Sequence, residues 1–117
     1  MITGIQSALS GLQAFTTEIE NNAKNVGNLN TTGFKKGRVV LSARVPQGVK
    51  ATVEQVGAPG PVIAEQTNQG MEMIEQSNVD LGEELSSMML IVHGYKANLK
   101  TLQVADQMLQ SVLDIKA

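Results

Sequence analysis

The chain of 117 residues has no cysteine, no tryptophan, one tyrosine and two phenylalanines. Without cysteine it has no disulfide framework, no cysteine-ligated zinc and no thiol nucleophile. Its single histidine, His93, cannot anchor a multi-histidine metal site. Because aromatic residues make up only 3% of the chain, any core must consist mostly of aliphatic side chains and methionine. We therefore expect no metal and no cofactor.

Charge and hydropathy exclude further classes. The chain has 9 Lys+Arg against 11 Asp+Glu, and this net charge of −2 argues against a dedicated nucleic-acid binder. No apolar run reaches about 18 residues, so we expect no membrane span. The N-terminal residues Met1 to Gly4 lack the basic residues and apolar run of a cleavable signal peptide.

The sequence contains no catalytic constellation. His93 has no cysteine to activate, and Ser86 and Ser87 lie on the same predicted helix as His93. The adjacent acids Glu83 and Glu84 point to different sides of a helix, so they do not form an acid–base pair. Gly57 to Gly60 lacks the lysine and hydroxyl residue of a phosphate-binding loop. We predict that the chain is not an enzyme.

The distribution of proline divides the chain into three parts of one structural unit. All three prolines lie between residues 46 and 61. We predict an N-terminal helix and asparagine-rich turn over 1–33, a short β or loop segment over 34–77, and a C-terminal helix over 78–117. The fold class is mainly α, with a small β-hairpin or irregular segment in the middle.

The C-terminal segment has the clearest periodicity. Two series of seven-residue spacing interleave with steps of four and three: Leu81, Met88, Tyr95, Leu102 and Leu109 with Leu85, Val92, Leu99, Asp106 and Leu113. This pattern is typical of a helix packed lengthwise against other helices. Asp80, or alternatively Ser77 or Asn78, would cap its N-terminus. The polar Asp106 either fixes register between helices or lies solvated at the seam edge.

The N-terminal segment has a weaker version of the same pattern. Ile5, Leu12, Ile19 and Val26 recur every seven residues, and Ala8, Phe15, Asn22 and Leu29 form the companion series. This helix would be marginal in isolation and would need a partner to remain folded.

The length of the C-terminal helix creates a second requirement. Residues 79–115 would span about 55 Å as one helix, whereas a compact chain of this length has a radius of gyration of about 13 Å. Beside its seam lies a further apolar stripe: Val104, Met108, Val112 and Ile115. Either the helix breaks, for example at Gly94, or its apolar surface is covered by other chains.

The middle segment reads as strand and turn. Apolar and polar residues alternate from Arg38 to Val45, a turn follows at 46–48, and Val49 to Val56 can return as a second strand. Charge is segregated in this part: the basic residues are Lys35, Lys36, Arg38, Arg44 and Lys50, and the interval from Glu54 to Glu84 has seven acids and no base. These blocks are either ordinary solvated faces or complementary patches on successive copies of an assembly.

Between the first helix and the middle segment lies a stretch rich in asparagine, Asn21 to Phe34. Asparagine favours caps and turns because its amide bonds nearby backbone groups. We predict a helix exit here with Gly33 at positive φ. We also expect the amides of Asn25 and Asn28 to bridge backbone groups where the helix meets the middle segment.

Two long motifs resemble the flagellar axial proteins of the rod and hook. The N-terminal motif spans Ser7 to Val39, and its core matches at Asn25, Val26, Asn28, Asn30, Thr31, Gly33, Phe34 and Lys35, with Gly27 where the family has alanine. The C-terminal motif spans Gln69 to Leu109 and matches at Ser77, Asn78, Val79, Asp80, Leu81, Tyr95, Ala97, Asn98, Lys100 and 106–109. It departs at 92–94, where Ala-Gln-Arg is common.

The resemblance implies an architecture. In this family the terminal helices pair as an antiparallel coiled coil that lines a helical tube, and the subunit leaves the cell through the flagellar type III export apparatus. Its intrachain core would then be Ile5, Leu12, Ile19 and Val26 against Leu85, Val92, Leu99 and Leu102. The 42 residues from 35 to 76 are too few for the large outer domain of a hook protein, which favours a rod-type subunit.

Two functional hypotheses remain open. The first is a self-assembling structural subunit of the flagellar basal-body rod, whose partners are itself, other axial proteins and the export apparatus. The second is an adaptor, a coiled-coil module that binds another protein's helix without polymerising. Neither hypothesis involves nucleic acid or a membrane span.

Overall fold

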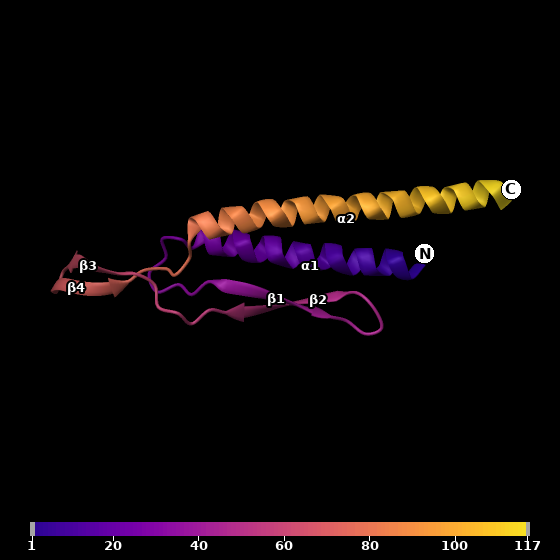
Figure 1. Ribbon diagram of the computed structural model, residues 1–117. Coiled ribbons are helices and arrows are strands. Elements are labelled where there is room, and N and C mark those ends of the chain that lie inside the picture. The colour runs from indigo at the N-terminus through magenta and orange to yellow at the C-terminus, as the bar shows by residue number, and fades with distance from the viewer. Residues whose placement is uncertain (1, 117) are drawn as a thin grey trace.

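The computed structural model describes residues 2–116 (Figure 1). Its elements, in chain order, are α1 (Ile2–Gly27), β1 (Gly37–Ala43), β2 (Val49–Gln55), β3 (Val62–Thr67), β4 (Gly70–Glu75) and α2 (Leu81–Lys116). The predicted mainly α fold, with two long terminal helices and β-hairpin structure between them, is confirmed.

The molecule is elongated, with extents of 80 × 25 × 18 Å and a radius of gyration of 20.8 Å. A compact chain of this length would have a radius of gyration of about 13 Å. The difference comes from α2, whose 36 residues continue through Gly94 without a break. The final turns of α2 extend past the end of α1 at which the N-terminus lies (Figure 1). None of the helices in the described chain is long and apolar enough to cross a membrane.

The two helices pack antiparallel and approach closely at two glycines. A Cβ added to Gly94 of α2 would lie 2.7 Å from Cζ of Phe15, and one added to Gly11 of α1 would overlap the Asn98 amide. Asn98 Nδ2 also donates to the Ala8 carbonyl across the helices at 2.8 Å. Each glycine therefore provides the hole that receives a side chain of the facing helix.

The β1–β2 hairpin lies along α1 on the side away from α2, so that α1 is the middle layer (Figure 1). Its strands are antiparallel, with Gly37 paired to Gln55 and Ala43 to Val49. The loop end is fixed to α1 because the Val49 N–H donates to Ser10 Oγ at 3.1 Å. The predicted strands at 38–45 and 49–56 agree with the observed strands to within two residues.

A second hairpin, β3–β4, was not foreseen from the sequence. It projects from the end of the molecule opposite the C-terminus and makes no contact with α1, α2, β1 or β2 (Figure 1). Thr67 pairs with Gly70 across a two-residue turn, and Gly70 has a φ of 117°. Two short strands without an apolar face to cover are marginal by themselves. The local alternation from 62 to 75 was therefore a weak signal.

Candidate functional site

The central polar feature of the molecule is the side chain of Asn25, which is 0% exposed. Its Oδ1 accepts the Gly37 N–H at 2.9 Å, and its Nδ2 donates to the Gly37 carbonyl at 3.0 Å and to Glu84 Oε1 at 3.1 Å. One amide thereby joins α1, the start of β1 and the first turn of α2. This confirms that Asn25 bridges backbone groups where the helix meets the middle segment.

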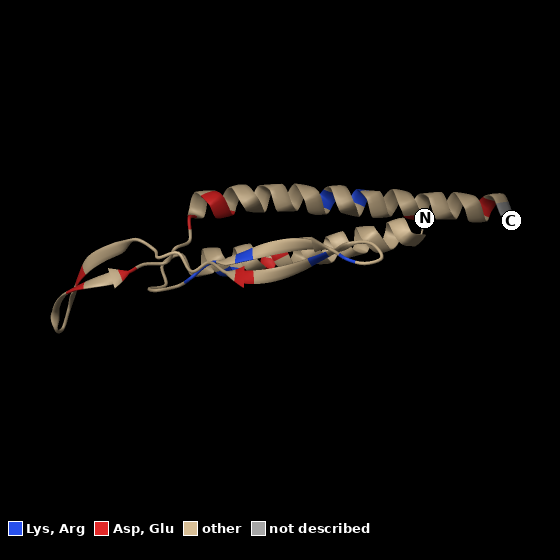
Figure 2. Cartoon of the chain, turned by 60° about the horizontal axis from the view of Figure 1, so that its bottom comes forward, with Lys and Arg blue, Asp and Glu red and all other residues tan. Residues whose placement is uncertain are grey.

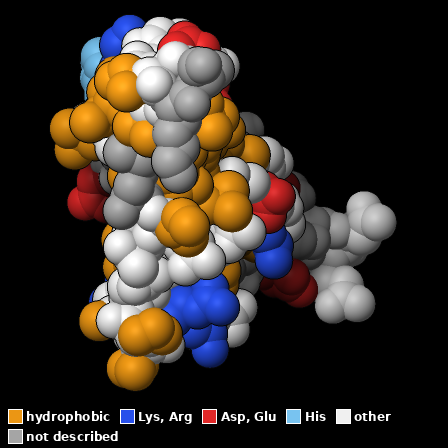
Figure 3. Space-filling view, turned by 90° about the vertical axis from the view of Figure 1, so that its right-hand side faces the viewer, with side chains coloured by type: hydrophobic (Ala, Val, Ile, Leu, Met, Phe, Trp, Pro, Cys, Tyr) orange, Lys and Arg blue, Asp and Glu red, His pale blue; other side chains and the backbone are white. Residues whose placement is uncertain are grey.

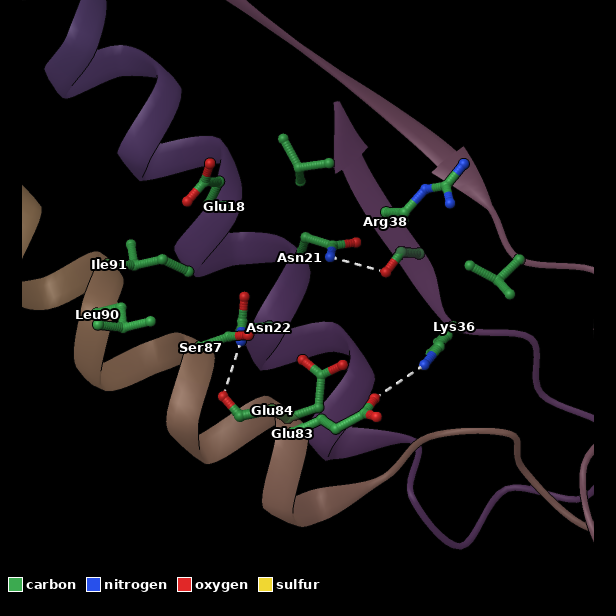
Figure 4. Close-up of a pocket in the computed structure, with 13 residues that line it drawn as sticks. Glu18, Asn21, Asn22, Lys36, Arg38, Glu83, Glu84, Ser87, Leu90 and Ile91 are labelled. Carbon is green, nitrogen blue, oxygen red and sulfur yellow. Dashed lines mark hydrogen bonds and ion pairs between the residues drawn. The ribbon is translucent and has the colours of Figure 1, made fainter. Parts of the chain in front are cut away.

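Two neighbouring asparagines extend the same junction. Asn21 Nδ2 donates to the Gly37 carbonyl at 2.9 Å, and Asn22 Nδ2 donates to the Glu84 carbonyl at 3.0 Å (Figure 4). A carbonyl in the first turns of a helix normally accepts an N–H group of its own helix. The Glu84 carbonyl of α2 also accepts the Asn22 amide of α1, so it bonds to two elements. We call Asn21, Asn22, Asn25, Gly37 and Glu84 the asparagine junction.

The C-terminal motif supplies a second bridging amide. Asn78 Oδ1 accepts the Lys36 N–H at 2.6 Å, and Asn78 Nδ2 donates to the carbonyls of Val56 and Ala58 at 3.0 and 2.9 Å. The Asn78 N–H donates to the Phe34 carbonyl at 3.2 Å. The two sequence motifs, separated by the whole middle segment, therefore meet in space.

The motif residues next to Asn78 lead into α2. Asp80 Oδ1 accepts the Gly82 N–H at 2.9 Å, which is the expected cap of a helix starting at Leu81. Ser77 and Val79 are buried immediately before it. The predicted cap at Asp80 is confirmed.

The N-terminal motif residues shape the exit from α1. Gly33 has a φ of 71°, as predicted, and its N–H donates to the Glu75 carbonyl at 2.9 Å. Asn28 does not reach the middle segment, since its Nδ2 returns to the Lys24 carbonyl at 2.7 Å and its Oδ1 accepts from Thr31. The expectation that Asn28 bridges to the middle segment is therefore wrong. Asn30 is exposed.

The segregated charges largely meet within the chain. Three bases pair with acids of the following block: Lys35 with Glu75, Lys36 with Glu83 at 3.3 Å, and Arg38 with Glu54 at 2.7 Å. The Lys35 ammonium, together with the Gly60 N–H, holds the pKa of the Glu75 carboxyl below its usual range. Of the basic block, Arg44 and Lys50 form no ion pair with the described residues 2–115.

A groove of about 420 Å³ lies beside the asparagine junction (Figure 4). Its lining combines three carboxylates, Glu18, Glu83 and Glu84, with Lys36 and Arg38. Partial burial raises the pKa of Glu18. The part of the chain that the structure describes holds no cluster of three His, Cys, Asp or Glu residues suited to a metal ion.

The face of α2 toward α1 differs from the predicted seam by one series. Apart from Gly94, which lies against Phe15, the least exposed positions of α2 are Glu84, Met88, Ile91, Tyr95, Asn98, Leu102, Ala105 and Leu109. These again step by four and three. The expected series of Met88, Tyr95, Leu102 and Leu109 belongs to this face, and on α1 Leu12 is buried while Ile5, Phe15, Ile19 and Val26 are half-buried.

The companion series on α2 does not form the predicted intrachain core. Leu85, Val92 and Leu99 are 48%, 37% and 48% exposed, so their predicted packing against α1 is wrong. Glu84, Ile91, Asn98 and Ala105 occupy that place. Polar residues are stable there because Glu84 and Asn98 bond asparagine amides and a carbonyl of α1. A count of apolar residues therefore selects the series of Leu85, Val92 and Leu99, because it does not register that Glu84 and Asn98 have hydrogen-bond partners on α1.

A second apolar side of α2 consequently faces outward. We call the exposed residues Leu85, Met89, Val92 and Leu99 the outer stripe and the exposed residues Val104, Met108, Val112 and Ile115 the overhang stripe. Hydrophobic side chains gather around the end of α2 when the molecule is viewed from its C-terminal end (Figure 3). Leu81 and Leu113 are also exposed, at 40% and 65%. Asp106 is exposed beside them and accepts a bond from Gln110 at 3.4 Å.

An elongated helix pair with an uncovered apolar side has the form of a subunit of a larger structure, because monomeric proteins rarely expose such a surface. Comparison with known proteins agrees with this class. Residues 71–115 match the family described as "Flagellar basal body rod FlgEFG protein C-terminal". This match includes α2 almost entirely, together with β4.

Similar proteins come from several bacteria. The chain is 33% identical over 73 residues to flagellar hook protein FlgE of Borreliella burgdorferi, covering 62% of this chain and 16% of that protein. It is 38% identical over 64 residues to FlgE of Treponema pallidum, covering 52% and 14%. It is 37% identical over 49 residues to flagellar basal-body rod protein FlgG of Bacillus subtilis, covering 42% and 19%.

The C-terminal part of the chain, residues 71–115, thus matches the flagellar rod and hook family, and the chain is similar to FlgE and FlgG proteins. The aligned parts make up less than a fifth of each of these relatives.

Proposed function

We propose that the chain is a structural subunit of the bacterial flagellar basal-body rod that self-assembles into a helical tube through its terminal helices. The observation that carries the proposal is the orientation of α2. One face of α2 packs on α1 and includes the polar Glu84 and Asn98, while the apolar outer stripe on another face is exposed to solvent. Burying the outer and overhang stripes against further copies would supply about 25 cal/mol for each Å² of apolar surface removed from water.

The assembly residues in this proposal are the exposed members of the predicted heptads, Leu81, Leu85, Val92, Leu99, Asp106 and Leu113, with the overhang stripe. Asp106 would then be a polar position that sets register between chains. Other axial proteins and the flagellar type III export apparatus are the remaining partners, and the basal body is the location. The match of residues 71–115 to the rod protein family and the similarity to FlgG support these assignments. The short middle segment supports a rod-type over a hook-type subunit.

The test is static light scattering of the purified chain over a concentration series. We expect the apparent mass to rise with concentration. Leu99→Glu should reduce this association while leaving helix content unchanged, because Leu99 is half exposed in the single chain. Gln103→Glu, an exposed substitution of equal charge on the same helix, is the matched control. A folded monomer at all concentrations would contradict the proposal.

Localisation in a motile cell separates the two hypotheses further. A rod subunit should be present in purified basal bodies. A chain that stays in the cytoplasm and binds one partner helix without polymerising would instead be the adaptor.

A further inference from the structure

We propose that the β3–β4 hairpin of one copy docks in the groove between α1 and β2 of the next copy, with Glu65 and Glu72 against Arg44 and Lys50. This inference rests on the proposed self-assembly and names a specific contact within it.

The first observation concerns the hairpin. Glu65 and Glu72 are direct register partners on β3 and β4, and both are exposed. Like charges directly opposite on two strands destabilise the pair. No base lies between Lys50 and Lys96 in the sequence, so the hairpin has no local cation. A cation from outside the hairpin would remove this repulsion.

The second observation concerns the groove. It has a volume of about 540 Å³ and is lined by Ser10, Gln13, Ala14, Thr17, Arg44, Val49, Lys50 and Ala51. Arg44 and Lys50 are the charged members of this lining, which contains no carboxylate. Neither base has an ion-pair partner within residues 2–115. An open groove with two free cations suits acidic side chains.

The apolar parts of the two surfaces also correspond. Ile63 is 47% exposed, and because side chains alternate along a strand it shares a face with Glu65 and Glu72. In the groove, Ala14, Val49 and Ala51 provide the apolar counterpart. The contact would bury Ile63 between two ion pairs.

The placement of these surfaces requires two copies. The acidic hairpin projects from one end of the molecule, and the basic loop end of β1–β2 points the opposite way (Figure 2). β3–β4 makes no contact with α1 or β2 of its own chain. Copies arranged along the long axis would bring the hairpin of one to the groove of the next. Exposed ion pairs of this kind set register and orientation more than affinity.

Disulfide cross-linking between two single-cysteine variants tests the contact, since the chain has no other cysteine. Ile63→Cys on one copy and Ala51→Cys on the other leave all four charges in place. Mixed under mild oxidation, they should form a heterodimer far faster than Ile63→Cys mixed with Ala23→Cys, an exposed control on α1. A heterodimer yield equal to that of the control would overturn the proposal.

Charge reversal provides a second arm. Adding Glu65→Lys and Glu72→Lys to the Ile63→Cys chain should lower cross-linking about tenfold, because two attractive pairs become repulsive. Adding Arg44→Glu and Lys50→Glu to the partner chain should restore it. Reversal without loss, or loss without rescue, would refute the assignment of these charges. Thermal unfolding of each variant checks that the helices remain folded.

These outcomes separate the contact from the proposed function. Cross-linking with charge rescue in a chain that does not polymerise would support the contact alone. Polymerisation that is insensitive to all four charges would support the rod subunit and reject this contact.

Discussion

Asn25 should be the most costly single asparagine to remove. In Asn25→Ala, the Gly37 N–H loses its acceptor and the Glu84 carboxylate loses a donor. The Gly37 carbonyl retains its bond from Asn21. Leaving a buried hydrogen-bonding group unpaired costs about 1–3 kcal/mol. Two such groups give an expected loss of about 2–6 kcal/mol in the free energy of unfolding, or a melting temperature lower by about 8–24 °C for a chain of this length.

Urea denaturation followed by circular dichroism measures this loss. Asn30→Ala is the matched control, because Asn30 is exposed and its side chain bonds no residue in the range 2–115. The control should change the free energy of unfolding by no more than about 0.5 kcal/mol. Equal stability of the two variants would refute the structural role of the asparagine junction.

A second substitution at the same position tests the electrostatics. Asn25→Asp keeps an acceptor for the Gly37 N–H but places a second carboxylate beside Glu84. At neutral pH it should be at least as destabilising as alanine. The loss should diminish as the pH falls, because a protonated carboxyl can donate again. A pH-independent loss would mean that solvent reaches this site.

Three further predictions concern Gly94 at the helix contact, Gly33 at the exit from α1, and Glu75 at the end of β4. Gly94→Val should displace Phe15 and cost about 1–3 kcal/mol, with thermal unfolding as the measurement and unchanged stability as the contradicting result. Gly33→Val should destabilise by about 1–3 kcal/mol because of the positive φ, whereas Gly33→Asn should retain most of the stability; equal losses would remove the backbone argument. Lys35 lowers the pKa of Glu75 in the folded chain below its ordinary value of 4.5. The ionised Glu75 therefore stabilises the fold above pH 4.5, and this contribution is lost as the pH falls through the pKa of the folded state. The wild type should therefore lose more stability than Glu75→Gln between about pH 5 and about pH 3, and parallel acid titrations would contradict this.

The sequence was sufficient for the large features of the fold because each is encoded locally. Heptad spacing specified two long helices, alternation specified the β1–β2 hairpin, and Asp80 and Gly33 marked a helix start and a turn. Each of these patterns depends on residues that are close to one another in the sequence. The β3–β4 hairpin had no such signal, because an exposed strand pair lacks the buried face that produces clear alternation.

The pattern of apolar residues did not reveal which face of α2 packs against α1. Glu84 and Asn98 lie toward α1 because their polar groups find hydrogen-bond partners there. Glu84 accepts from Asn22 and Asn25, and Asn98 donates to the Ala8 carbonyl. Those partners lie 59 to 90 residues away in sequence. Pairing at such a separation is a property of the folded chain, and a tally of apolar positions favours the outward face instead.

The sequence separation of these bonds also governs the order of folding. The bonds from Asn22 and Asn25 to Glu84 and from Asn98 to Ala8 each close a loop of 59 to 90 residues. Contacts of this kind form late, since the entropy of loop closure is lost before the bond is gained. A chain that arrives N-terminus first therefore lacks the partner of the Asn22 amide and one partner of the Asn25 amide until Glu84 is present. Pairing of the helices is then a final, all-or-none closure that requires both ends of the chain.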